Sequence, residues 1–210
     1  MGGGNYDGDV AERTRSTTRA FNYEQRVERS QPQERKCHAS LNPKNTVREC
    51  LDNPEHLTTT ALVIVTDTSE SRGEDAEVIY GKLPRFIGQL YKRNLLTDPT
   101  LSVCGCGDAT TDVAPIQPSQ FEADNRMDTH LGNLWRERNG GGTGEESYQL
   151  AAYFYDQHTK LDCVKKRGEL GWCFFLGDEA PYPKVSKAEV KRIFGDALDK
   201  DLETQKIFAD

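Results

Sequence analysis

Apolar residues occur at two different spacings along the chain and predict alternating strands and helices from about residue 58 onward. Ala61–Val65 is a short, continuous apolar run rich in β-branched residues, which is typical of a strand buried on both faces in a parallel sheet. After a polar turn, apolar residues recur at helical spacing from Asp75 to Arg93. We expect a helix there, kinked or divided at Pro84.

The same alternation continues to the end of the chain. Further strands are expected at Leu101–Gly107, at Ala114–Phe121 and at Gly171–Leu176. The second of these should lie at a sheet edge because it contains two prolines, and the third should be buried, with Trp172, Phe174 and Phe175 in the core. Helices are expected at 124–138, from Tyr148 to Phe154 and from Ser186 to Asp199. The pattern predicts an α/β protein, a three-layer α/β/α sandwich with a mainly parallel central sheet.

Residues 1–58 differ in character from the predicted domain at 59–210. They are rich in polar residues and show no sustained period, so we expect a polar, partly irregular arm. Between Arg13 and Lys36 seven basic and three acidic residues leave a charge of +4. A solvated extension is the simpler interpretation, and RNA binding by the 13–36 segment is a weaker one.

Overall charge and cysteine usage narrow the function classes. The 210 residues carry a net charge of −7, which disfavours general nucleic-acid binding as the main role. No stretch reaches the length of a membrane helix, and the first residues lack an apolar signal core. With no export signal, the six cysteines are expected to be reduced thiols, and the location to be cytoplasmic.

Oxygen-bearing side chains follow two of the predicted strands. Asp67, Ser69 and Ser71 come directly after the first strand, and Asp178 follows the strand ending at Leu176. The carboxyl ends of parallel strands meet at one edge of a sheet, where ligands bind. Thr143 lies in a glycine-rich loop that enters a helix. Carboxylates and hydroxyls without His or Cys favour Mg²⁺, or Mn²⁺ or Ca²⁺, over Zn²⁺.

The segment Asp67-Thr-Ser69-Glu-Ser71 resembles the Asp-x-Ser-x-Ser signature of the von Willebrand factor type A (vWA) family, which builds a metal ion-dependent adhesion site (MIDAS). The Thr143 loop is similar to the second loop of that site, and the strand ending in Asp178 to the third. The resemblance covers about residues 58–200 and is closest to bacterial and phage vWA-like proteins.

This resemblance implies a metal-binding module that is not an enzyme. Ser69, Ser71 and Thr143 would contact the metal, Asp67 and Asp178 would hold it directly or through water, and the open position would accept an Asp or Glu of a partner protein. Two departures stand out. Glu145 or Glu146 could replace Thr143 or add negative charge, and the family's last strands are expected to be missing here. The chain is then either a fragment or a shortened sheet completed by something else.

Other interpretations remain open at this level. Asp-x-Ser-x-Ser also occurs in ordinary helix caps and turns, and Asp108 is more simply a turn residue. A metal-dependent phosphoester hydrolase could use the same cluster, although Ser69 stands where aspartyl-phosphate enzymes have a second Asp. Zinc binding is disfavoured for lack of a C-x-x-C pair, and nucleotide binding for lack of a P-loop Lys. The four cysteines considered for zinc, Cys104, Cys106, Cys163 and Cys173, are more simply small buried residues.

Overall fold

The computed structural model describes residues 4–7, 9, 21–30, 36–69, 72–137 and 144–209, which form a mixed α/β structure. The main sheet has four strands in the order β4-β3-β2-β7, and β2 runs parallel to both of its neighbours, β3 and β7. The antiparallel strand β4 ends the sheet on one side. The bounds of these strands are β2 Thr60–Asp67, β3 Pro99–Cys106, β4 Ile116–Pro118 and β7 Trp172–Leu176.

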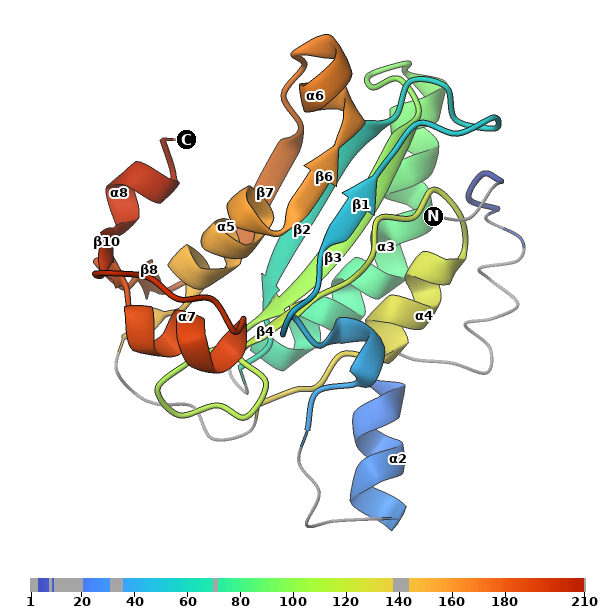
Figure 1. Cartoon of the computed structure of the whole chain (residues 1–210). Helices are drawn as coiled ribbons and strands as arrows, with labels where there is room; N and C mark the ends of the chain where they lie inside the picture. Colours follow the sequence, from blue (N-terminus) through green and yellow to red (C-terminus); the bar gives the residue numbers. More distant parts are fainter. Residues whose placement is uncertain are drawn as a thin grey trace.

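Helices and short strand pairs surround this sheet (Figure 1). The helices are α2 Asn22–Ser30, α3 Gly73–Lys92, α4 Arg126–Gly132, α5 Tyr148–Gln157, α6 Asp162–Arg167, α7 Lys187–Ile193 and α8 Thr204–Ile207, with a 3-10 turn η1 at Ala39–Leu41. The short strands are β1 Arg48–Cys50, β5 Glu145–Glu146, β6 Thr159–Leu161, β8 Ala180–Pro181, β9 Lys184–Val185 and β10 Leu202–Glu203. They pair as β1-β6, β5-β8 and β10-β9.

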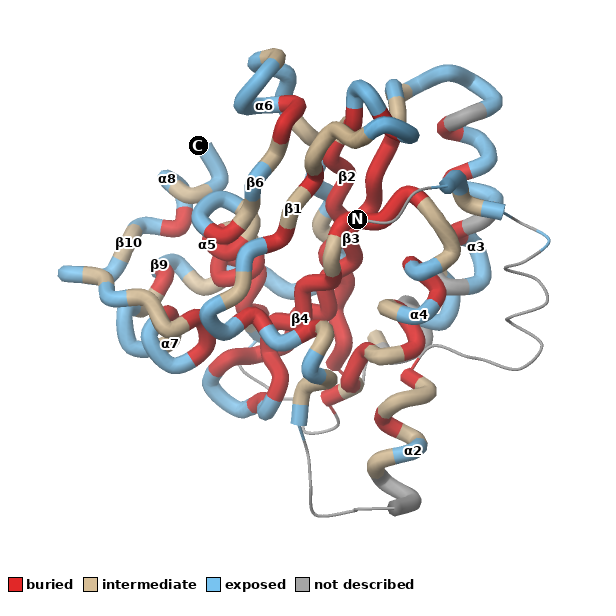
Figure 2. Tube along the Cα trace, turned by 45° about the vertical axis from the view of Figure 1, so that its right-hand side comes forward, coloured by how far each residue is buried: buried red, intermediate tan, exposed pale blue. Residues whose placement is uncertain are grey.

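Strand β2 is buried on both faces, which explains its continuous apolar run. Ala61, Val63 and Val65 belong to one hydrophobic cluster, together with residues of α5. Leu62 and Ile64 belong to a second cluster, with residues of α3 and α4. Because side chains alternate along a strand, the two clusters lie on opposite faces of the sheet. Figure 2 shows β2 and β3 as buried segments in the middle of the molecule.

Most predicted elements are confirmed, with shifted ends. Helix α3 runs through Pro84 without being divided, and apolar side chains on either side of the proline, Leu83 and Ile87, are buried in the same cluster. Helix α4 ends at Gly132, earlier than expected. Trp135, three residues further on, exchanges two hydrogen bonds of 2.7 Å between its backbone and the Gln117 side chain, which holds this segment out of the helix.

The prediction of a buried strand at 171–176 is wrong in one respect. The strand forms as β7, but it pairs only with β2 among the described residues and lies at the sheet edge. Trp172 is 53% exposed and Phe174 45% exposed, and Cys173 is also exposed. Phe175, on the other face, is partly buried against the first cluster. An apolar sequence shows that a strand can be buried on both faces. How much of it is actually covered depends on which strands and helices pack beside it.

Part of the predicted arm is joined to the rest of the molecule. Strand β1 pairs in parallel with β6, more than a hundred residues later. Phe21 is fully buried in the second cluster, and Arg48 donates a hydrogen bond from Nη2 to the Ser40 carbonyl at 2.7 Å. In the described part of the chain, no helix is both long and apolar enough to cross a membrane.

Candidate functional site

Asp67, the last residue of β2, lies at the carboxyl edge of the parallel strands. Its side chain is fully buried. One carboxylate oxygen, Oδ1, accepts a hydrogen bond from the backbone N–H of Ser69 at 2.7 Å, and the other, Oδ2, accepts one from the Tyr148 hydroxyl at 3.4 Å. Tyr148 is the first residue of α5, so Asp67 is fixed both by its own turn and by a helix far away in the sequence.

The structure describes three of the five predicted site residues. Asp67 and Ser69 are adjacent and buried. Asp178 follows β7, whose Leu176 is paired with Thr66, so its loop also begins at this edge. The Asp178 side chain is about half exposed and lies 3.6 Å from Arg72 in an ion pair. Ser71 and Thr143 lie outside the described residues.

Further acidic side chains gather at the same edge. The most informative is Glu146 on β5, which is 8% exposed. Within the described residues its Oε2 atom has no hydrogen-bond partner. Burial raises the pKa of Glu146 to about 8, and the negative charges of Asp67, Asp112 and Asp108 raise it in the same direction. The sequence hinted at this role only through the two glutamates of the glycine-rich loop.

Two more buried carboxyls extend the cluster. Burial raises the pKa of Asp112 to about 6 and that of Glu137 to about 7, and each group also has a neighbouring acid as a secondary cause. Asp112 accepts a hydrogen bond from the Asp108 N–H at 2.7 Å, and Glu137 accepts one from the Ala114 N–H at 2.6 Å. The sequence carries no signal for either carboxyl, because their burial comes from packing between loops.

Asp108 itself behaves as the turn residue that the sequence predicted. Its Oδ1 accepts hydrogen bonds from the backbone N–H and the hydroxyl of Thr110, at 2.8 and 2.7 Å. The Tyr182 hydroxyl, from a later part of the chain, donates to the same oxygen at 3.1 Å. The turn therefore also fixes the 182 segment against this edge.

The arginine that forms an ion pair at this edge, Arg72, does so with Asp178 and not with the buried carboxyls. In the part of the chain that the structure describes, Asp67, Asp112 and Glu146 form no ion pair with Lys or Arg. Arg192 comes near, but its guanidinium donates to the Ala109 carbonyl. Buried carboxylates without a counter-ion are energetically costly, so the cluster would gain stability from a bound cation.

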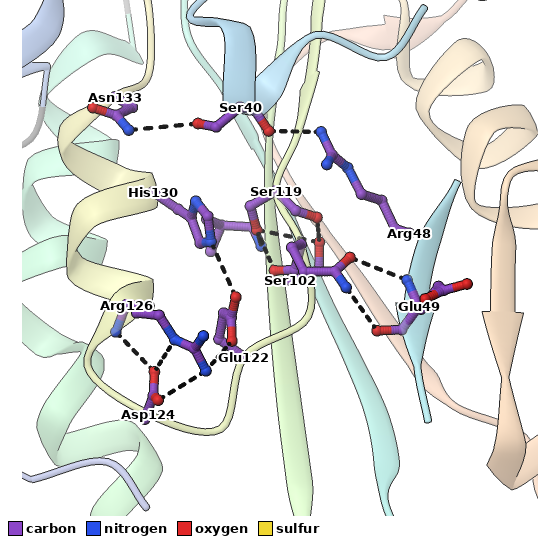
Figure 3. Close-up of polar contacts among 12 residues, drawn as sticks. Ser40, Arg48, Glu49, Ser102, Ser119, Glu122, Asp124, Arg126, His130 and Asn133 are labelled. Atoms are coloured by element: carbon purple, nitrogen blue, oxygen red, sulfur yellow. Dashed lines mark hydrogen bonds and ion pairs between the residues drawn. The ribbon is translucent and has the colours of Figure 1, made fainter. Parts of the chain in front are cut away.

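A second polar network, at the other end of β3, contains acidic residues that are paired with basic ones (Figure 3). There Glu122 and Asp124 share the guanidinium of Arg126 at 2.9 and 3.0 Å, and His130 lies 3.6 Å from Glu122. These carboxylates have their counter-ion within the protein. Ion pairing within the protein explains why these acidic residues are tolerated there. The buried carboxyls at the Asp67 edge have no such explanation.

The donors at the Asp67 edge are compatible with a hard divalent cation but do not enclose one by themselves. Carboxylate oxygens suit Mg²⁺ and Ca²⁺, and the Glu146 Oε2 atom, which has no hydrogen-bond partner among the described residues, is a suitable ligand. Among the described residues, however, no group of three or more His, Cys, Asp or Glu side chains is arranged to hold a metal ion. A cation here would therefore depend on hydroxyl and water ligands as well.

The zinc alternative gains no support from the cysteines. Cys104 and Cys106 are fully buried, and burial raises the pKa of both thiols, that of Cys104 to about 12. Cys173 lies on the exposed edge strand. Thiols held in their protonated form are poor ligands for zinc.

No protein-family model matches the chain, and neither the curated proteins nor the solved structures include a significant match.

Proposed function

We propose that the carboxyl edge of the sheet binds a divalent cation, Mg²⁺ in the first place, and that the protein uses it to capture an acidic residue of a partner protein. The observation that carries the proposal is the set of buried carboxyls around Asp67. Among the described residues Asp67, Asp112 and Glu146 have no Lys or Arg counter-ion, and the Glu146 Oε2 atom has no hydrogen-bond partner. The Asp-x-Ser-x-Ser turn that begins at Asp67 is the sequence feature that fits it.

The three-layer arrangement of the fold is part of the same proposal. Clusters on both faces of the sheet, one with α5 and one with α3 and α4, are compatible with a vWA-like three-layer sandwich. In this arrangement Asp67, Ser69 and Ser71 form the first loop of the site, Thr143 the second and Asp178 the third. When bound, the cation supplies an electrophilic centre with an open coordination position for a carboxylate.

The residues of the proposed site differ in burial, and this suggests different roles. Asp67 is fully buried, and each of its oxygens already accepts a hydrogen bond, so its remaining lone pairs can serve a cation or a cation-bound water. Asp178 is about half exposed and forms an ion pair with Arg72, so it remains accessible from solvent. A buried Asp67 with both oxygens engaged is a poor nucleophile, which favours binding over the hydrolase alternative.

Isothermal calorimetry with Mg²⁺ and Mn²⁺ tests the cation site. We compare the parent protein with Asp67→Asn, which retains an oxygen to accept from the Ser69 N–H, and with Asp124→Asn as a control at the Arg126 network. We expect the parent and the control to bind the cation with similar affinity, and Asp67→Asn to bind it at least tenfold more weakly. No binding in the parent, or equal binding in Asp67→Asn, would overturn the proposal.

Capture of a carboxylate needs a separate measurement. Bound Mn²⁺ with an open position enhances the relaxation of water protons, and acetate taking that position should reduce the enhancement. Asp124→Asn should respond like the parent. An enhancement that acetate leaves unchanged would retain the cation site but refute the partner mechanism, and metal-dependent turnover of p-nitrophenyl phosphate would favour the hydrolase.

A further inference from the structure

Strand β7 exposes one whole edge of the main sheet. It pairs with β2 from Trp172 to Leu176, and no described strand pairs with its other side. Its outward N–H and C=O groups are therefore available to another strand. Natural proteins usually protect such an edge with charged residues, proline or a bulge. The segment Trp-Cys-Phe-Phe-Leu contains neither a charge nor a proline.

Both faces of this strand are also apolar and incompletely covered. On the α3 side Phe174 and Leu176 are 45% and 41% exposed and line a hollow of about 310 Å³ together with Phe86 of α3. On the α5 side a larger hollow of about 680 Å³ is lined by residues that include Cys173 and Phe208. A contiguous apolar surface around an open strand edge is typical of an interaction site.

We propose that β7 pairs antiparallel with β7 of a second copy of this chain, forming a symmetric dimer with a continuous eight-stranded sheet. The two-fold axis is perpendicular to the sheet and passes near Phe174. This rotation reverses the strand direction but leaves the α3 sides of both copies on the same face. Trp172 of one copy then lies opposite Leu176 of the other, so the two apolar rows join.

The charges flanking β7 fit this direction of pairing. Lys165 lies near the beginning of the strand, where it lines the larger hollow beside Leu170 and Trp172. Glu179 follows the end of the strand. Neither forms an ion pair within the described part of the chain. Antiparallel pairing brings the Lys165 end of one copy toward the Glu179 end of the other, and does so twice.

The exposed apolar area around β7 is close to what a dimer interface buries. Seven apolar residues around β7 are between 36% and 78% exposed, namely Phe86, Val164, Leu170, Trp172, Phe174, Leu176 and Phe208. At about 100 Å² each they present roughly 700 Å² per copy, close to the roughly 800 Å² per partner of a stable interface. The contact uses this surface and the free strand edge together.

Sedimentation equilibrium of the full chain from 1 to 100 µM tests the dimer, with EDTA present so that no metal contributes. The expected mass at high concentration is twice the 23.6 kDa of the chain. Phe174→Lys places two charges at the axis and should weaken self-association at least tenfold. Leu57→Lys, at an apolar residue that is 70% exposed and lies before β2, should leave it unchanged. Circular dichroism establishes that each variant is folded.

Hydrogen exchange on the unmodified protein provides a readout that needs no variant. Amides of 172–176 should exchange more slowly at 100 µM than at 1 µM, while those of β4, the other edge, should not change. A parent protein that remains a monomer at 100 µM, or a dimer that Phe174→Lys leaves intact, would overturn the proposal. So would exchange of 172–176 that is independent of concentration.

Discussion

Glu137 allows the electrostatics of the acidic edge to be tested without any ligand. Its side chain is 4% exposed, and its pKa is raised from 4.5 to about 7, first by burial and then by the charge of Asp112. The folded protein therefore holds a proton on Glu137 that the unfolded chain releases near pH 4.5. The stability that this proton provides is fully present below pH 4.5 and is lost as the pH rises through 7.

The size of the effect follows from the shift. A difference of about 2.5 pKa units corresponds to about 3 kcal/mol, since each unit is worth about 1.4 kcal/mol. The substitution Glu137→Gln removes the titration but retains Oε1 as acceptor for the Ala114 N–H, at 2.6 Å in the parent. We expect the variant to be up to about 3 kcal/mol more stable than the parent at pH 8, and to show little gain at pH 4.5.

Urea unfolding at pH 4.5, 6, 7 and 8 in EDTA, followed by tryptophan fluorescence, measures this difference. Asp112 still titrates in the variant, so the dependence on pH should become shallower without vanishing. Glu169→Gln serves as the control, because that side chain is 63% exposed and remains in contact with water in both states. The same dependence on pH in parent and Glu137→Gln would refute the proposed burial of charge at this edge.

Three further changes test the core and the site. Leu131→Ala empties a fully buried position between α4 and the sheet and should lower the free energy of unfolding by about 3 kcal/mol; a loss below about 1 kcal/mol in urea unfolding would contradict this packing. Glu146→Gln should stabilise the metal-free protein at pH 8, with a shift in the urea midpoint, and weaken Mg²⁺ binding in calorimetry; unchanged values in both assays would remove Glu146 from the site. Gly177→Ala places a Cβ against the buried Tyr148 ring, whose hydroxyl donates to Asp67. It should lower the melting temperature and weaken Mg²⁺ binding. A melting temperature equal to the parent's would show that the Tyr148 ring moves freely.

The sequence predicted those features that depend on residue spacing and on the chemistry of neighbouring residues. The run Ala61–Val65 reads as a buried parallel strand because both of its faces are apolar, and β2 has both faces covered. Ser186 reads as a helix cap, and its side chain accepts a hydrogen bond from the Glu189 N–H. The glycines of 101–107 predict close packing, and a side chain at Gly105 would meet Leu134 and Thr68 at 3.0 Å.

The candidate site was predictable only in part. Asp67 and Ser69 follow from a strand that runs directly into an Asp-x-Ser turn, and the structure brings them together in the buried edge. Glu146 and Glu137 carried no comparable signal. Each is buried because loops from distant parts of the chain close over it, and such contacts leave no periodic trace in the sequence.

By itself, the sequence determined the type and order of the main elements and the oxygen-rich turn at Asp67, since these depend on residue spacing and on the chemistry of neighbouring residues. Only the tertiary structure decided that the apolar strand β7 lies at an exposed edge, and that several carboxyls share a buried region. The physical reason is common to both. Burial depends on which elements lie beside a residue in space, and this is set by the packing of the whole chain.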